Sequence, residues 1–115
     1  MIVPNNTTGT NNTAIGYVAN VTAGNLTNAA AIGANAVVSA SNSLVLGGTG
    51  TNAVKVGIGT AIPRAEMDVV GTGAIIVPVG TAAQRPAPPV RGMIRYNTTN
   101  NKFEGYDGAG WQNLN

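Results

Sequence analysis

The side chains that could carry acid or base chemistry are four carboxylates, and they form two close pairs: Glu66 with Asp68, and Glu104 with Asp107. Alternate residues of a strand point the same way, so the first pair would share a face. An arginine lies near each pair, Arg64 or Arg95. We therefore expect ion pairing or solvation rather than catalysis. The chain has no histidine and no cysteine, which removes imidazole and thiolate chemistry. We predict no catalytic residue, no cofactor and no metal site.

Charge and hydropathy limit the possible partners. The chain of 115 residues carries 6 basic and 4 acidic side chains, a net charge of +2, which is too sparse for a surface that tracks phosphates. We expect no nucleic-acid partner. No apolar run reaches the length that spans a bilayer, and the N-terminus lacks the basic and then apolar pattern of a secretory signal. We expect no membrane insertion.

A short sequence phrase repeats through the first half of the chain and predicts the strands that precede the charged residues. Its copies are Thr13-Ala14-Ile15-Gly16, Ala30-Ala31-Ile32-Gly33, Leu44-Val45-Leu46-Gly47 and Val56-Gly57-Ile58-Gly59. Each copy is long enough for one strand closed by a glycine turn, and the spacing leaves room for a second short strand. Asn, Thr, Ser and Gly, which favour turns, fill the gaps. This pattern predicts a coiled parallel β-roll or β-solenoid.

The aligned phrases predict which side chains share a face. Alternation along each strand places the large aliphatic residues on one face, namely Ile15, Ile32, Leu44, Leu46, Val56 and Ile58. The small residues Ala14, Ala31, Val45 and Gly57 point to the other face. About two sizeable apolar side chains per coil do not offset the entropy of ordering the coil. A further burial surface is needed, and copies of the same chain around a three-fold axis would supply it. The alternative, a poorly ordered low-complexity linker, would need no such register.

The repeat carries a resemblance to known families. The pattern N-x-A-I-G-x-x-A, present at Asn12 to Ala19 and approximately again at Asn28 to Ala36, is similar to head repeats of trimeric autotransporter adhesins and to repeats of bacteriophage tail fibres. The resemblance covers about residues 11 to 60 and departs from the family pattern in its uneven spacing and degenerate later copies. It implies a left-handed parallel β-roll in which three chains pack seam to seam, so the partner would be the chain itself, as a homotrimer.

The remaining residues favour the tail-fibre family. Val56 to Thr60, then Pro63 and Met67 to Val69, resemble a V-G-I-G-T-x-x-P-x-x-x-L-D-V junction of tail fibres, with Met67 in place of the usual Leu. Three later segments resemble a small domain near fibre C-termini: Val79 to Pro86, Gly92 to Asn97 and Phe103 to Tyr106, closed by Trp111. An autotransporter adhesin would continue into a coiled-coil stalk and a membrane anchor. Neither pattern follows here, which favours the tail fibre. The alternative is a fragment of a bacterial trimeric adhesin at the cell surface that binds host surface ligands.

The last third of the chain predicts further strands. Ala74 to Val79 is an apolar run typical of one buried strand. Gln84 to Pro89 should be extended, because its prolines exclude helical geometry. Met93 to Tyr96, Lys102 to Tyr106 and Trp111 to Leu114 should form two hairpins. A register that pairs Tyr96 with Phe103 also places Arg95 opposite Glu104.

The predicted fold is all-β: a trimeric parallel β-roll or β-solenoid shaft at 1–60, a junction at 61–73 and a small antiparallel β-meander domain at 74–115. The resemblance implies a non-enzymatic tail-fibre module in the virion that projects or performs host-surface attachment. A bacterial surface glycan or protein would be its receptor. Candidate receptor residues are Tyr96, Asn100, Asn101, Tyr106, Asp107 and Trp111. The alternative for the aromatic residues is a role in the hairpin core and in contacts between chains.

Overall fold

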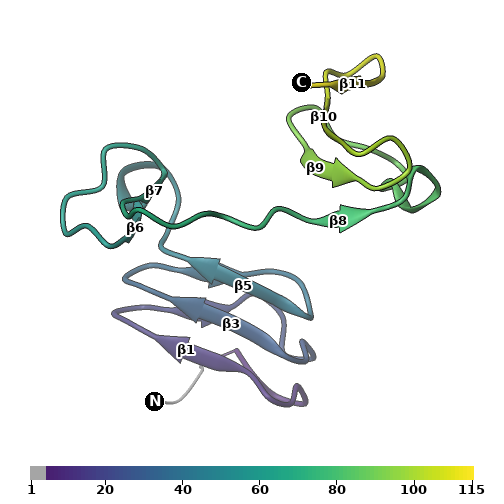
Figure 1. The fold of residues 1–115 in the computed structure, drawn as a ribbon. Helices are drawn as coiled ribbons and strands as arrows, with labels where there is room; N and C mark the ends of the chain where they lie inside the picture. Colours follow the sequence, from purple (N-terminus) through teal and green to yellow (C-terminus); the bar gives the residue numbers. More distant parts are fainter. Residues whose placement is uncertain (1–4) are drawn as a thin grey trace. The chain divides into compact units, whose positions relative to one another are not determined.

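The computed structural model describes residues 5–115 and is built almost entirely of strands (Figure 1). The chain divides into two compact units, Met1–Val70 and Gly71–Asn115, each described here by itself. The helical segments in the described part are two short 3-10 turns, η1 at Gly50–Asn52 and η2 at Ala82–Gln84. The division falls after Val70, so most of the predicted junction belongs to the first unit.

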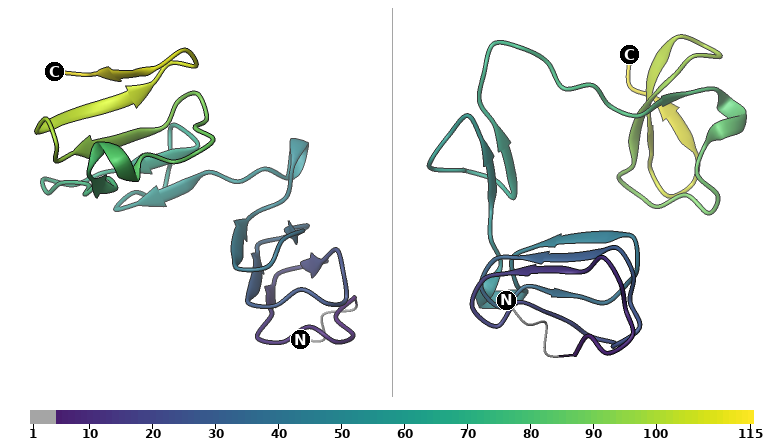
Figure 2. Two further views of the ribbon diagram at one scale, coloured as in Figure 1. Left: turned by 90° about the vertical axis from the view of Figure 1, so that its right-hand side faces the viewer. Right: turned by 90° about the horizontal axis from the view of Figure 1, so that it is seen from below.

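The first unit begins as a β-solenoid. Its first sheet has the strand order β1-β3-β5, all parallel, with β1 at Thr13–Ile15, β3 at Ala29–Ile32 and β5 at Ser43–Leu46. A second parallel sheet pairs β2 at Asn20–Val21 with β4 at Val37–Val38. Seen along the stack, the successive coils lie over one another (Figure 2, right). The predicted parallel coils, with two short strands each, are confirmed.

The register of the first sheet follows the repeated phrase. Ile15 is opposite Ile32, and Ile32 is opposite Leu46, so equivalent residues of three phrases form one column. The glycine that ends each phrase forms a bend, after which the chain runs along the next side of the coil. Gly16 has φ of +135°, and a Cβ there would lie 2.4 Å from the Gly33 carbonyl oxygen. Only glycine permits this close approach of two coils.

Asparagines occupy most of the tight turns between strands. Asn28, Asn35 and Asn42 all have positive φ, between 55° and 57°, which asparagine tolerates better than most residues. The Asn28 side chain donates to the Asn42 side chain of the next coil at 3.1 Å. These stacked amides hold consecutive turns in register, which is the physical role of the polar residues between the phrases.

The core of the solenoid consists of small side chains. Its buried hydrophobic residues are Ala14, Ala19, Val21, Ala29, Ala31, Ala36 and Val38, with Leu26 and Val45 packed against them. The small-residue columns predicted to face away from the aliphatic residues therefore point inward. A core of alanine and valine buries little apolar area per residue, so most of the large aliphatic side chains of this unit lie elsewhere.

The fourth phrase does not extend the solenoid, and the prediction of a fourth stacked copy is wrong. Strand β6 at Val56–Ile58 pairs in parallel with β7 at Met67–Val69 and forms a separate two-stranded sheet. The connection from β5 contains η1, where the Gly48 amide donates to the Asn52 carbonyl and closes a loop. This loop redirects the chain, and β6 takes its hydrogen bonds from the new strand after Pro63. That new strand was predicted and is confirmed.

The second unit contains a four-stranded sheet of order β11-β10-β9-β8. Strands β9 at Ile94–Asn97, β10 at Lys102–Tyr106 and β11 at Trp111–Asn113 are antiparallel to their neighbours. The predicted register is confirmed, since Tyr96 is opposite Phe103 and Arg95 is opposite Glu104. Strand β8 at Val79–Gly80 adds to β9 in parallel, a pairing that the antiparallel prediction did not include.

The prediction of a buried strand over Ala74 to Val79 is wrong for most of its length. Only Val79 lies in a strand, and the Ile76 side chain is 91% exposed. Pro78 has no amide hydrogen to donate, although its carbonyl accepts a hydrogen bond from the Tyr96 amide. Residues 74–77 lie in no strand, and all of them except the partly buried Val77 are exposed, so most of the apolar run is not covered by its own chain.

Candidate functional site

A continuous row of large aliphatic side chains covers the outer face of the β1-β3-β5 sheet. Ile15 is 54% exposed, Ile32 37%, Leu46 45% and Leu44 60%. We call these four residues the aliphatic stripe. Alternation along the strands forces this outcome, because Ala14 and the residues aligned with it occupy the inner face. Adjacent strands of a sheet lie close together, so the stripe is one apolar patch rather than scattered exposed residues.

The solenoid that carries the aliphatic stripe has no charged side chain. The first charged side chain in the sequence is Lys55, which follows the last strand of the solenoid. This absence is visible in the sequence and would have marked the whole repeat region as suited to self-association, but our predictions did not use it. Burial of the stripe against another surface would desolvate no charged group of the solenoid, and two identical stripes would not repel each other.

The other two predicted seam residues do not join the stripe. Val56 and Ile58 belong to β6, whose partner is β7 rather than β5. Ile58 is half exposed and Val56 is partly buried. The aliphatic stripe therefore ends at β5, and any surface around Ile58 is a separate one.

The second unit has a buried charge cluster centred on Glu104, which has no exposed surface. Arg85 donates to both carboxylate oxygens, from Nε at 3.1 Å and from Nη2 at 2.6 Å. Arg95 Nη1 donates to Oε1 at 2.9 Å, and Asn97 Nδ2 donates to Oε2 at 2.9 Å. The hydrogen bonds from Arg85, helped by Asn97 and Arg95, lower the pKa of Glu104 to about 2 against the opposing effect of burial.

The cluster confirms the ion pair predicted between Glu104 and Arg95 and adds Arg85, which sequence reasoning missed. Arg85 lies 19 residues before Glu104, directly after η2, whose Thr81 and Gln84 side chains form a capping box. That short turn aims the guanidinium at the sheet. Glu104 is held ionised and fully hydrogen-bonded, so it can neither release nor take up a proton near neutral pH.

The other carboxylates also have structural roles. Asp68 is buried and accepts from the Arg64 amide and guanidinium, and these bonds lower the pKa of Asp68. Asp107 Oδ1 accepts from the amides of Gly110 and Ala109, both at 2.8 Å, which lowers the pKa of Asp107. Glu66 is exposed. The expectation of ion pairing or solvation is confirmed, and neither carboxylate pair has the environment of an acid/base pair.

The candidate receptor residues do not form one surface. Tyr96 packs edge-on against Phe103, with ring centroids 5.1 Å apart, on one face of the sheet. Tyr106 and Trp111 pack together on the opposite face, where Trp111 also lies against Arg85. The others are exposed on two different hairpin loops: Asn100 and Asn101 on one, and Asp107 on the other. These loop residues lie outside the aromatic packing, although Asn100 donates to the Asn113 side chain and Asp107 accepts from two amides of its own loop.

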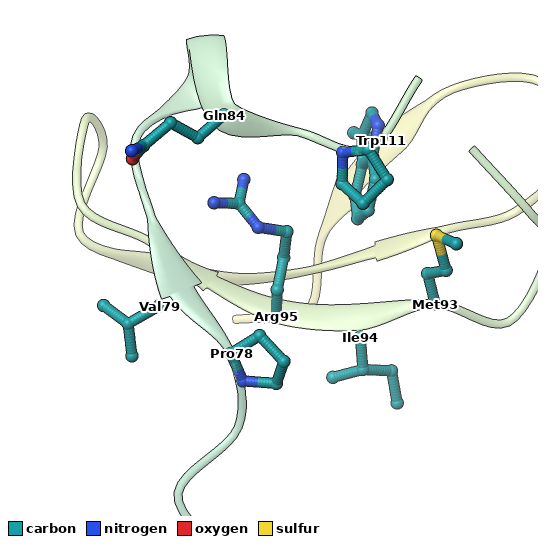
Figure 3. Close-up of a pocket in the computed structure, with 8 residues that line it drawn as sticks. Pro78, Val79, Gln84, Met93, Ile94, Arg95 and Trp111 are labelled. Atoms are coloured by element: carbon teal, nitrogen blue, oxygen red, sulfur yellow. The ribbon is translucent and has the colours of Figure 1, made fainter. Parts of the chain in front are cut away.

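A hollow of about 370 Å³ shares Arg95 with the charge cluster. Figure 3 draws the residues that line it. It is lined by Pro78, Val79, Gln84, Pro86, Met93, Ile94, Arg95 and Trp111. Both polar side chains are already engaged, since Gln84 accepts from the Thr81 amide and Arg95 donates to Thr81 and Glu104. A mostly apolar hollow whose one charged group, the Arg95 guanidinium, is already hydrogen-bonded offers little to orient a charged ligand.

Within residues 5–115, no helix is long and apolar enough to cross a membrane. The same part of the chain has no group of three or more acidic, histidine or cysteine side chains that could hold a metal ion. Comparison with protein families, curated proteins and solved structures found no match to this chain.

Proposed function

We propose that this protein is a non-enzymatic structural module of a bacteriophage or phage-like tail fibre. In this proposal three copies assemble through their solenoids, and the assembly projects or performs attachment to the host surface as part of the virion. The observation that carries the proposal is the aliphatic stripe of Ile15, Ile32, Leu44 and Leu46, exposed on a region without charged side chains. The resemblance of the repeat to tail-fibre repeats gives the biological setting.

The energetics of the solenoid support self-association. Its core is made of alanine and valine, while its largest aliphatic side chains face solvent. Fully burying a leucine or isoleucine side chain contributes about 1.5–3 kcal/mol, so the stripe holds more potential stabilisation than the alanines of the core. A second copy provides a surface of the same chemistry. Three copies around an axis bury every stripe equally and leave no open end, which suits a closed assembly.

Attachment is the part of the proposal that concerns the second unit. The exposed loop residues Asn100, Asn101 and Asp107 are its candidate contacts, because their side chains can hydrogen-bond to a glycan or a protein. Binding of fluorescently labelled protein to bacterial cells tests this. We expect Asn101→Gly, which keeps the positive φ of this turn, to reduce binding without changing the mass of the assembly.

Sedimentation equilibrium of the purified chain tests the assembly, and we expect the mass of three chains. The protein has no cysteine, so a single introduced thiol reports on one position. Ile32→Cys should give a covalent trimer with a short three-armed maleimide. The control Ser39→Cys, exposed after β4 in the other sheet, should not. A single-chain mass at every concentration would refute the proposal.

A further inference from the structure

The turn after β1 contains a residue in an unfavourable conformation. Val18 has φ of +58°, in the left-handed region that a β-branched side chain rarely adopts. The other non-glycine residues with positive φ in the described part of the chain are all asparagines: Asn11, Asn28, Asn35, Asn42 and Asn101. Asparagine relieves this conformation by local hydrogen bonding, and valine cannot. Val18 therefore costs the isolated fold stability.

The fold itself does not require valine at this turn. The equivalent turn of the next coil has Ala34 and Asn35 where the first coil has Tyr17 and Val18, and the Asn35 amide donates to the Tyr17 carbonyl at 2.7 Å. In both turns an alanine amide closes the bend by donating to the glycine carbonyl three residues earlier, from Ala19 at 3.3 Å and from Ala36 at 3.2 Å. The second coil thus follows the same backbone path with alanine and asparagine in place of tyrosine and valine.

Nothing within the described residues compensates for the two bulky side chains at this turn. Tyr17 is 79% exposed and Val18 is 59% exposed. A strained backbone normally persists where the surrounding structure or a functional contact requires it. Stacking of the coils fixes the backbone path of this turn, but it gives no reason for tyrosine and valine there, because neither side chain is buried.

We infer that Tyr17 and Val18 are contact residues of the interface between copies of this chain, which extends from the aliphatic stripe around the corner of the first coil. The inference rests on the proposed function, since it adds residues to the same self-interface. Ile15, the first member of the stripe, ends the strand that leads into this turn. The occupant is a second copy of the chain rather than a charged ligand, because the corner is continuous with the stripe and the solenoid has no charged side chain before Lys55.

Burial of Tyr17 is the direct test. In the assembled wild-type protein, hydroxyl-radical footprinting read by mass spectrometry compares the three tyrosines of the chain. In the isolated chain Tyr17 is exposed, whereas Tyr96 and Tyr106 are partly buried in the second unit. The inference expects Tyr17 to react no faster than Tyr96 in the assembly. Reaction of Tyr17 as the most accessible tyrosine would overturn it.

Variants provide the second test. For each variant we would measure the urea concentration and the protein concentration at which the assembly dissociates. Tyr17→Ser leaves the turn conformation unchanged and should weaken association at least about tenfold (about 1.4 kcal/mol). Val18→Asn relieves the backbone but removes a contact, so we expect no gain in stability. The matched pair Asn35→Val and Asn35→Gly both lose the hydrogen bond from Asn35 Nδ2 to Asn52 Oδ1 at 3.3 Å, so a lower stability of the valine variant shows that the conformation is costly.

The outcomes separate this inference from the proposed function. Weaker assembly of Tyr17→Ser together with no gain for Val18→Asn supports it. Wild-type-like assembly of Tyr17→Ser, with Val18→Asn more resistant to urea, overturns it while the trimer proposal stands. A wild-type chain that sediments as a single copy at all concentrations overturns the proposed function and this inference with it.

Discussion

Replacement of Glu104 by glutamine should unfold the second unit. Four donor groups point at the carboxylate: two from Arg85, one from Arg95 and one from Asn97. Glutamine has one acceptor oxygen and places an amide NH₂ group where the other oxygen lies. Donors would then face donors, and the Arg95 guanidinium, 6% exposed, would lose its counter-charge.

Removing one member of a buried ion pair costs about 3–5 kcal/mol, because the remaining charge stays desolvated. A domain of this size rarely has more than about 3–5 kcal/mol of stability in total. We therefore expect Glu104→Gln to be largely unfolded in its second unit even without denaturant.

The fluorescence of Trp111 measures this unit selectively, because Trp111 is the only tryptophan of the chain and lies against Arg85 and Arg95. Urea titrations should show a cooperative transition for the wild type and none, or one at far lower urea, for the variant. The control Asp107→Asn makes the same chemical change at an exposed loop of the same unit and should keep the wild-type transition.

A Glu104→Gln variant that unfolds within 1 M urea of the wild type would refute the reasoning. A double replacement, Glu104→Leu with Arg95→Met, provides an internal check. It removes both buried charges and should be less damaging than Glu104→Gln, since the cation that remains, Arg85, has a side chain that is 32% exposed and can be solvated.

Three further predictions follow from the same contacts. The pKa of Glu104 is lowered from 4.5 to about 2, so its contribution to stability is full above about pH 4.5 and is lost as the pH falls through 2. Acid titration followed by Trp111 fluorescence should place the unfolding of the second unit in this range. Gly16→Ala should prevent stacking of the first two coils and lower the thermal midpoint of the β-sheet circular dichroism signal, because its Cβ would lie 2.4 Å from the Gly33 carbonyl oxygen. Arg64→Ala should lower the thermal midpoint of the first unit only modestly, because the arginine side chain is 77% exposed and the amide of residue 64 still donates to the buried Asp68 carboxylate.

The sequence alone determined the features that depend on local spacing. The alternation within each phrase placed Ala14 and Ala31 inside the solenoid and Ile15 and Ile32 outside it, because the side-chain period of a strand is two. The second hairpin strand paired as predicted, since only one register brings Tyr96 to Phe103 and joins opposite charges at the next position.

Tertiary structure decided the pairings that local patterns leave open. The fourth phrase keeps the aliphatic alternation of the first three, with Gly57 at the inner position, yet the η1 loop turns it toward β7. Arg85 reaches Glu104 across 19 residues because a capped turn aims it. The conformation of Val18 is likewise set by the stacking of its coil on the next one. Strand identity follows from short-range periodicity, whereas the choice of partner depends on the path of the connecting chain, and that path is fixed only when the coils pack.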